Sequence, residues 1–182
     1  MLTKNLEQTL NKFGAYVVKQ SKENLAKDVN KYGSNKAGGD LDNSIEYTLD
    51  VESNLFLVDF LMEDYGIFVD KGVRGKTSTY PETRSSLSKF QYGSGNFPKD
   101  GLTKGLQSWL KKKRFQWRNK LGQFMSYESM SYLMARSIYN KGLKANLFFS
   151  TPFEQALKNL PKEMNESFAL DIENAIILGV KK

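Results

Sequence analysis

Two consecutive apolar stretches between residues 41 and 62 place the strongest constraint on the fold of this chain. In 41–51 apolar residues alternate with polar ones, and this period of two predicts a strand with one buried and one solvated face. The next stretch, 55–62, is apolar on both faces except at Asp59 and predicts the return strand of a hairpin. A sheet with two apolar faces needs two covers. We expect one from the N-terminal helix and the second from later helices or from a neighbouring subunit.

The N-terminal helix is predicted over residues 2–29. Apolar residues recur there every three or four positions, in the order Leu2, Leu6, Leu10, Phe13 and Val17. That spacing places them on one stripe of an amphipathic helix. The glycine- and asparagine-rich segment 32–39 is expected to end it.

Residues 65–75 predict a short helical turn that joins a folded body to a mobile arm. Tyr65, Phe68 and Val69 are spaced as one apolar helical face, and Gly72 and Gly75 are expected to end the turn and free the arm after it. The arm, residues 76–98, shows neither helical nor strand periodicity, which is uncommon inside a compact domain unless the loop is functional. It carries four isolated aromatic residues that suit anchoring in a partner, namely Tyr80, Phe90, Tyr92 and Phe97. The alternative is a loop folded back on its own surface.

Three further helices are predicted downstream. The first is capped by Asp100, and the second is capped by Ser126 and ends at Gly142. The third begins with a capping box of Thr151, Pro152 and Glu154, and is broken or kinked at Pro161. Together the elements predict an α+β fold, with a small antiparallel sheet packed by helices, a long extended arm and C-terminal helices. A length of 182 residues predicts one domain over 1–182 that includes the arm.

The residue inventory argues against most catalytic chemistry. The chain has no Cys and no His, which removes disulfides, thiolate nucleophiles, the commonest zinc ligands and the usual general base. It also lacks a GxxxxGK[ST] phosphate loop and a GxGxxG fingerprint. Asp59 and Asp70 are the best candidates for a carboxylate pair, and each also fits a plain structural role. We therefore expect no enzyme, no metal and no cofactor.

A basic cluster supports a second class of function. Lys111, Lys112, Lys113 and Arg114 precede Phe115 and Trp117 in a chain with a net charge of +7. Cations interleaved with aromatic rings can bind phosphates and stack bases. The alternative is a solvated helix end whose cations complement the helix dipole. No signal peptide or membrane-spanning stretch is recognised, so we expect a soluble protein made in the cytoplasm.

Two motifs resemble a known family in order and spacing. The run 65–75 is similar to the segment of bacteriophage tail-completion and head-to-tail connector (neck) proteins in which a tyrosine and a small residue precede two apolar residues, an acidic residue and a glycine. The runs 135–145 and 147–153 resemble the segment that enters their last helix. The long arm and the 111–117 cluster depart from the shorter members of that family.

The resemblance implies a non-catalytic α+β subunit of a ring in the virion neck, between portal and tail. It implies a homo-oligomer, for which we expect 12-fold or 6-fold symmetry, with portal or adaptor and tail proteins as partners, and no membrane. Expected subunit-interface residues are Tyr65, Phe68, Asp70, Arg74, Tyr80, Phe90, Tyr92 and Phe97. Lys111, Lys112, Lys113 and Arg114 are expected to face DNA in transit, weakly. The competing hypothesis is a nucleic-acid-binding protein that uses 111–117.

Overall fold

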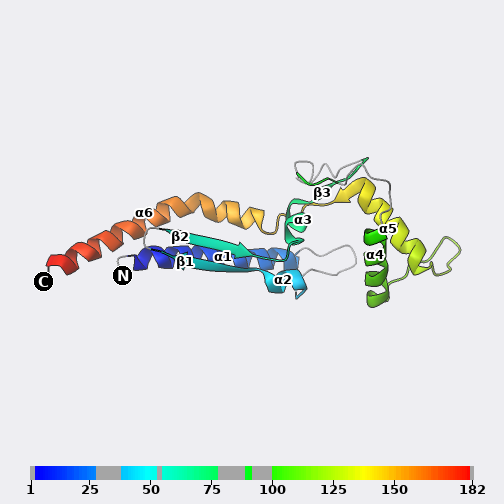
Figure 1. The fold of residues 1–182 in the computed structure, drawn as a ribbon, viewed down its shortest axis with the longest axis horizontal. Helices are drawn as coiled ribbons and strands as arrows, with labels where there is room; N and C mark the ends of the chain where they lie inside the picture. Colours follow the sequence, from blue (N-terminus) through cyan, green and yellow to red (C-terminus); the bar gives the residue numbers. More distant parts are fainter. Residues whose placement is uncertain (1–2, 28–37, 53–54, 78–88, 92–99, 181–182) are drawn as a thin grey trace. The chain divides into compact units, whose positions relative to one another are not determined.

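The computed structural model describes residues 3–27, 38–52, 55–77, 89–91 and 100–180. The chain divides into two compact units. Unit 1 comprises residues 1–66 and 147–182, and unit 2 comprises residues 67–146. The predicted α+β class is confirmed, with long helices and small antiparallel sheets (Figure 1). That one domain spans both units stays a prediction.

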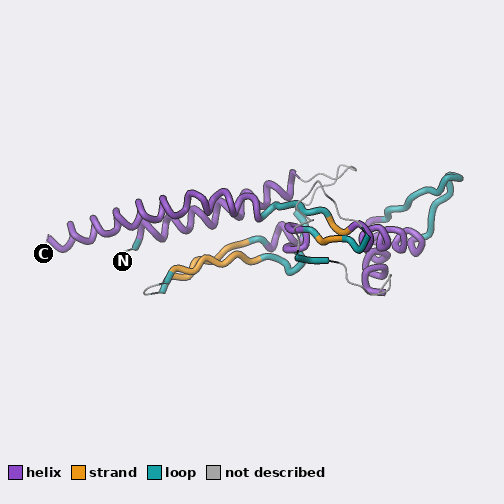
Figure 2. The backbone as a smooth tube through the Cα atoms, turned by 90° about the horizontal axis from the view of Figure 1, so that it is seen from above, coloured by secondary structure: helices purple, strands orange, loops and turns teal. Residues whose placement is uncertain are grey.

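Unit 1 is built from two long antiparallel helices and a β-hairpin. Helix α1 (Lys4–Lys27) confirms the predicted N-terminal helix, and α6 (Ser150–Val180) runs beside it (Figures 1 and 2). The hairpin strands are β1 (Glu46–Val51) and β2 (Phe56–Leu61), which pair antiparallel with Thr48 opposite Asp59. The helix α1 contacts both strands, which confirms that it covers one face of the hairpin.

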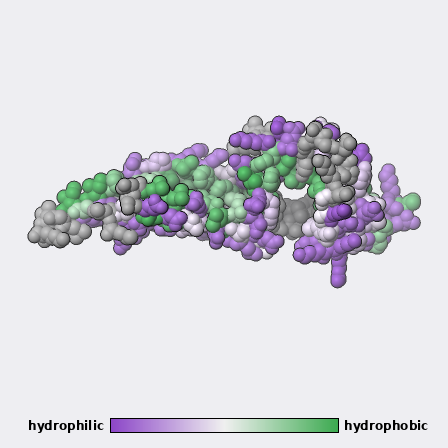
Figure 3. Space-filling view, viewed as in Figure 1, coloured by the Kyte–Doolittle hydropathy of each residue, from purple (hydrophilic) through white to green (hydrophobic). Residues whose placement is uncertain are grey.

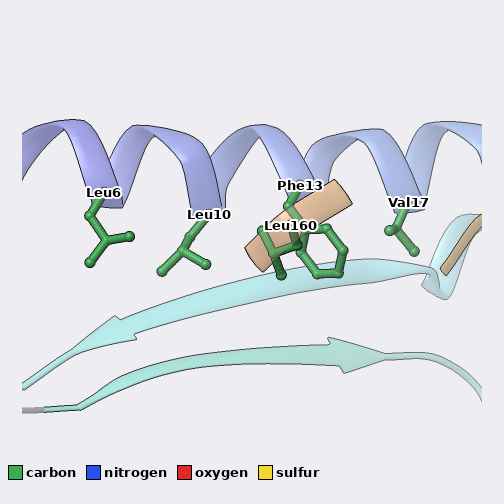
Figure 4. Packing of buried hydrophobic residues seen from close by; sticks show 5 residues of the cluster. All are labelled: Leu6, Leu10, Phe13, Val17 and Leu160. Carbon is green, nitrogen blue, oxygen red and sulfur yellow. The ribbon is translucent and has the colours of Figure 1, made fainter. Parts of the chain in front are cut away.

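The hydrophobic core of unit 1 lies between these elements. The stripe of α1 predicted from the sequence faces inward, and Figure 4 shows Leu6, Leu10, Phe13 and Val17 pointing toward the strands, with Leu160 from α6 among them. Phe60 of β2 joins this cluster through an edge-on contact with the ring of Phe13, and the two ring centres are 6.0 Å apart. Burying such aliphatic and aromatic side chains contributes roughly 1.5–3 kcal/mol each.

The hairpin begins later than the alternation predicts. Residues Asp40–Ser44 form a short helix, α2, and Leu41 is buried as part of it. Leu41 and Ile45 are four residues apart, so their spacing also fits one helical turn. The strand pattern is therefore valid only from Glu46 onward.

The outer face of the hairpin has no second cover within the described residues. Exposure alternates along both strands, so the polar positions of β1 and Leu57, Asp59 and Leu61 of β2 face outward. Leu57 and Leu61 remain 45% and 46% exposed. Helix α6 packs with α1 and does not supply the cover expected from the later helices.

Helix α6 corrects the predicted start of the last helix. The Thr151 N–H donates to the Leu147 carbonyl at 3.3 Å, so Thr151 already lies inside the helix and the predicted capping box is wrong. The helix is not broken at Pro161, since it continues through this residue as one element of 31 residues, and the alternative of a kink there stays a prediction. Its packing along α1 outweighs the hydrogen bond that a proline removes.

A buried carboxylate ties the two long helices together near the start of α1. The backbone N–H groups of Asn5 and Leu6 donate to the two carboxylate oxygens of Asp171, each at 3.0 Å, and the Asn5 side-chain amide donates at 2.9 Å. Burial opposes ionisation of Asp171, but these hydrogen bonds outweigh it and hold its pKa below the usual value. Asp171 therefore caps α1 from a helix 165 residues away in sequence.

The described residues of unit 2 form three helices and a minimal two-stranded sheet. The helices are α3 (Gly66–Lys71, which starts at the boundary between the units), α4 (Asp100–Lys113) and α5 (Tyr127–Lys141). The strands β3 (Val73–Arg74) and β4 (Gly142–Leu143) pair antiparallel. Helices α4 and α5 pack on each other and bury Leu110, Met130 and Ala135.

The ends of α5 agree with the sequence. Ser126 accepts a hydrogen bond from the Ser129 N–H at 3.1 Å, which confirms its role as N-cap. Gly142 ends the helix with φ +82° and donates its N–H to the Ile138 carbonyl. Helix α4, in contrast, includes Asp100 as its first residue. None of the helices in the described part of the chain is long and apolar enough to cross a membrane.

Candidate assembly surfaces

The predicted interface residues around 65–75 lie partly at the surface and partly inside unit 2. Phe68 is exposed on α3, whereas Asp70 is only 3% exposed and its side chain does not reach the surface. Tyr65 is exposed in unit 1. Burial raises the pKa of the Tyr65 hydroxyl, and the carboxylates of Asp40 and Glu63 raise it further. The phenol therefore stays neutral at physiological pH.

Of the four arm aromatics, the structure describes Phe90. The Phe90 carbonyl accepts a hydrogen bond from the Arg74 N–H at 2.9 Å, and its ring lies 4.6 Å from that of Phe68. Phe90 is thus half-buried on its own subunit, as the alternative of a loop folded back on its own surface expects, and its contact with a partner stays a prediction. Tyr80, Tyr92 and Phe97 lie outside the described residues.

The segment after Gly75 is anchored, whereas the sequence predicted a free hinge. The N–H groups of Lys76 and Thr77 donate to the carbonyls of Tyr139 and Asn140 at the end of α5. The helical turn itself and the left-handed backbone at Gly72, with φ +69°, agree with the prediction. Pairing of β3 with β4 extends this anchoring back to Val73.

The predicted DNA-facing cations lie at the end of α4 and are all exposed. Lys111, Lys112 and Lys113 form the last turn of the helix, and Arg114 leaves it with φ +53°. The cations therefore lie beside the negative end of the helix dipole, as the alternative interpretation expected. A DNA-facing cluster and a solvated helix end both remain open, because both interpretations predict exposed cations at this position.

An ordered loop comes directly after this cluster. The Asn119 side-chain oxygen accepts hydrogen bonds from the N–H groups of Leu121 and Gln123, and Gly122 turns the chain with φ +77°. The Arg118 guanidinium donates to the Gly122 carbonyl at 2.7 Å and lies 4.1 Å from the centre of the Phe124 ring. These contacts give residues 118–124 the form of a turn with a defined shape.

The tip of this loop presents apolar side chains to solvent. Leu121 is 82% exposed and Phe124 is 60% exposed. In Figure 3 the loop between α4 and α5, at the right edge of the view, shows hydrophobic surface bordered by hydrophilic residues. Apolar side chains held this far out by a structured loop are typical of contact sites, because a packed core gains nothing from them.

A second surface is the outer face of the hairpin, whose need for a cover was predicted from the sequence but whose negative charge was not. It combines carboxylates with leucines, and its members are Glu46, Asp50, Leu57, Asp59 and Leu61. The sequence does contain a signal for this negative charge, since residues 37–70 hold nine Asp and Glu and no Lys or Arg. The apolar periodicity of 41–62 predicts the strands but assigns no role to this charge.

A groove in unit 1 could hold a small ligand. An open groove of ≈ 470 Å³ runs between α1 and α6 of unit 1, where Lys12 and Glu163 are the charged lining residues. In the described part of the chain, no group of three or more Asp or Glu is arranged to hold a metal ion. Asp59 and Asp70, the carboxylates considered for catalysis, belong to different units, and Asp59 is exposed.

Comparisons of the chain with protein-family models, with curated proteins and with solved structures find no match.

Proposed function

We propose that this protein is a structural subunit of a homo-oligomeric ring in the neck of a bacteriophage virion, where it joins the portal complex to the tail. The observation that carries the proposal is the outer face of the hairpin, which the described residues leave uncovered. A two-stranded sheet is marginal in water and gains stability when its apolar residues are covered. A neighbouring subunit in a ring can supply the cover that this subunit lacks.

Helix α6 supports the same proposal. Its C-terminal half exposes several large apolar side chains, and hydrophobic surface gathers along this part of the helix in Figure 3. They are Phe168, Leu170, Ile172, Ile176 and Ile177. A helix with this much exposed apolar surface is typical of a protein that associates. The resemblance of residues 65–75 and 135–153 to neck proteins directs the proposal to the virion.

The experiment is a mass measurement of the purified protein across a range of concentrations. Native mass spectrometry is expected to give a closed ring, with 12-fold or 6-fold symmetry as the first candidates, and electron-microscopy class averages are expected to show it. If the protein remains monomeric at high concentration and does not bind portal or tail proteins, the proposal is wrong.

Nucleic-acid binding is the second candidate function, and a specific observation favours it. Residues 101–127 contain seven Lys and Arg and no Asp or Glu, and Lys111 to Arg114 are all exposed. If these cations contact six or more phosphates, the affinity for DNA falls by roughly 10³-fold or more between 50 and 200 mM salt. An electrophoretic mobility assay across that salt range tests this, and no salt-dependent shift would reject it.

A further inference from the structure

The two units of this chain carry opposite charge. Unit 2 contains 16 Lys and Arg against four Asp and Glu, whereas unit 1 contains 11 against 16. The formal charges are therefore +12 and −5, which together give the net +7 of the chain. Such separation is unusual within one small protein and acts as an electrostatic guide for association.

The negative charge of unit 1 is concentrated on a surface suited to contact. We call the outer face of the hairpin, defined by Glu46, Asp50, Leu57, Asp59 and Leu61, the acidic face. In the register of the strands, Asp50 lies opposite Leu57 and Glu46 lies opposite Leu61, so carboxylates and leucines alternate across the sheet. None of its three carboxylates forms an ion pair with another described residue.

Unit 2 carries the matching surface. We call the end of α4 and the loop after it, residues 111–125, the basic loop. Its cations Lys111, Lys112, Lys113 and Lys120 are exposed and form no ion pair within the described residues. The apolar tip formed by Leu121 and Phe124 lies on the same loop. Each surface thus offers both charge without an ion-pair partner among the described residues and exposed apolar side chains, with the charges opposite in sign.

We propose that the basic loop of one subunit docks on the acidic face of a second copy of this chain. Cations would pair with Glu46, Asp50 and Asp59, while Leu121 and Phe124 would cover the exposed leucines. The second copy is the occupant because this sequence itself provides the complementary charge and the complementary apolar tip. Nucleic acid would match the cations alone and would leave the acidic face uncovered.

This contact joins two different patches, so it is heterologous. Repeated head-to-tail contacts of this kind close into a ring when the rotation between subunits allows it. The inference rests on the proposed ring function and specifies which surfaces build the ring. Because exposed charges contribute to it, association is expected to weaken as salt rises.

Charge reversal tests the contact directly. Asp50→Lys with Asp59→Lys reverses two of the three negative charges of the acidic face, and Lys112→Glu with Lys113→Glu reverses two of the six positive charges of the basic loop. We expect each pair to weaken self-association about tenfold or more at 100 mM salt, because like charges are then placed together. A chain that carries all four substitutions is expected to regain part of the association, since the substituted positions on the two surfaces again carry opposite charges. Sedimentation velocity measures the association, and circular dichroism checks the fold.

The matched control is Lys19→Glu with Lys158→Glu, which changes the net charge as Lys112→Glu with Lys113→Glu does, but on exposed residues outside both surfaces. It is expected to leave association unchanged. If Asp50→Lys with Asp59→Lys does not fold, the neutral pair Asp50→Asn with Asp59→Asn takes its place. This pair is expected to weaken self-association less than the charge reversal does.

The outcomes separate this inference from the function on which it rests. If the wild type forms rings and neither reversal changes association, the inference is wrong and the ring function stands. If both reversals weaken association but the fourfold variant does not recover, the two surfaces do not meet each other and the inference is also wrong. If the wild type neither self-associates nor binds portal or tail proteins, the proposed function itself fails. Loss of DNA binding by Lys112→Glu with Lys113→Glu, with association intact, would assign the basic loop to nucleic acid.

Discussion

Gly142 occupies a position in unit 2 that has no room for a side chain. It ends α5 with φ +82°, and a Cβ built there would meet the Val73 carbonyl oxygen and, at 2.6 Å, the Gly75 nitrogen. Both neighbours are backbone atoms of the paired segment, so no side chain can move to make room. We expect Gly142→Ala to destabilise unit 2 by about 1–3 kcal/mol or more. Trp109 and Trp117 both lie in unit 2, so tryptophan fluorescence during urea unfolding reports the loss.

Gly105 provides the opposite control in the same unit. It lies on the exposed side of α4, and a Cβ built there meets nothing within 4 Å. Gly105→Ala is expected to stabilise the helix by about 0.5–1 kcal/mol, because alanine loses less conformational entropy on folding. Equal effects of the two substitutions would contradict the steric account of Gly142.

Asp171 is the residue whose protonation we expect to affect the stability of unit 1. In Asp171→Asn an amide N–H₂ replaces one of the two carboxylate oxygens, so one N–H at the start of α1 loses its acceptor. We expect Asp171→Asn to lower the unfolding free energy of unit 1 by roughly 1–3 kcal/mol at pH 7. The folded-state pKa of Asp171 is lowered, so its stabilisation is complete above the usual aspartate pKa and is lost as the pH falls through the folded value.

Urea unfolding of wild type and Asp171→Asn from pH 7 down to pH 2 checks this prediction. The difference in unfolding free energy is expected to be constant near neutrality and to shrink in the acid range. Asp64→Asn, at an exposed aspartate of the same unit, is the control and should show little difference at any pH. If the difference in unfolding free energy between wild type and Asp171→Asn is unchanged at pH 2, the ionised carboxylate is not its source.

At the scale of elements, the loop of residues 118–124 owes its shape to Asn119. Asn119→Ala removes the acceptor for the N–H groups of Leu121 and Gln123. Each such hydrogen bond contributes a net ~0.5–1.5 kcal/mol. Amide hydrogen exchange at residues 121–123 is therefore expected to accelerate roughly threefold to tenfold, while α5 keeps its protection.

Gln123→Ala is the matched variant for the loop. Its side-chain oxygen accepts only the side-chain N–H of Asn119, so both backbone hydrogen bonds to Asn119 survive. Exchange at residues 121–123 should stay close to wild type. Acceleration of the same size in both variants would show that the loop is held by something other than the Asn119 acceptor.

The elements that the sequence predicted correctly are those whose signal is local and repeated. The stripe of α1 and the Ser126 and Gly142 ends of α5 depend on spacing and capping chemistry within a few residues. The predicted start of α6 was wrong, because the chain enters the helix through the carbonyl of Leu147, before the capping-box residues. The strands β3 and β4 have two residues each, and their partners are about 70 positions apart in the sequence. Such short strands show no periodicity from which they could be predicted.

At the scale of the whole molecule, the candidate surfaces were only half predictable. The basic cluster at Lys111 was recognised because four cations are adjacent in sequence. The acidic face was missed because Asp50 and Asp59 come from different strands and become neighbours only through the hairpin register. The contact of Phe90 with Phe68 was not predicted, because it spans 22 positions and Phe90 lies in a segment without periodicity.

The division into two units predicts two separable unfolding transitions. Leu10 is buried in unit 1 and Leu110 is buried in unit 2, and truncation of a buried leucine to alanine costs about 2–5 kcal/mol. Since both tryptophans lie in unit 2, Leu110→Ala is expected to lower the midpoint of the fluorescence transition, and Leu10→Ala is expected to leave it unchanged. Far-UV circular dichroism should register both substitutions, because α1 and α6 supply much of the helix. If Leu10→Ala shifts the fluorescence midpoint as far as Leu110→Ala does, the units unfold together, and the single domain predicted from chain length is the correct description.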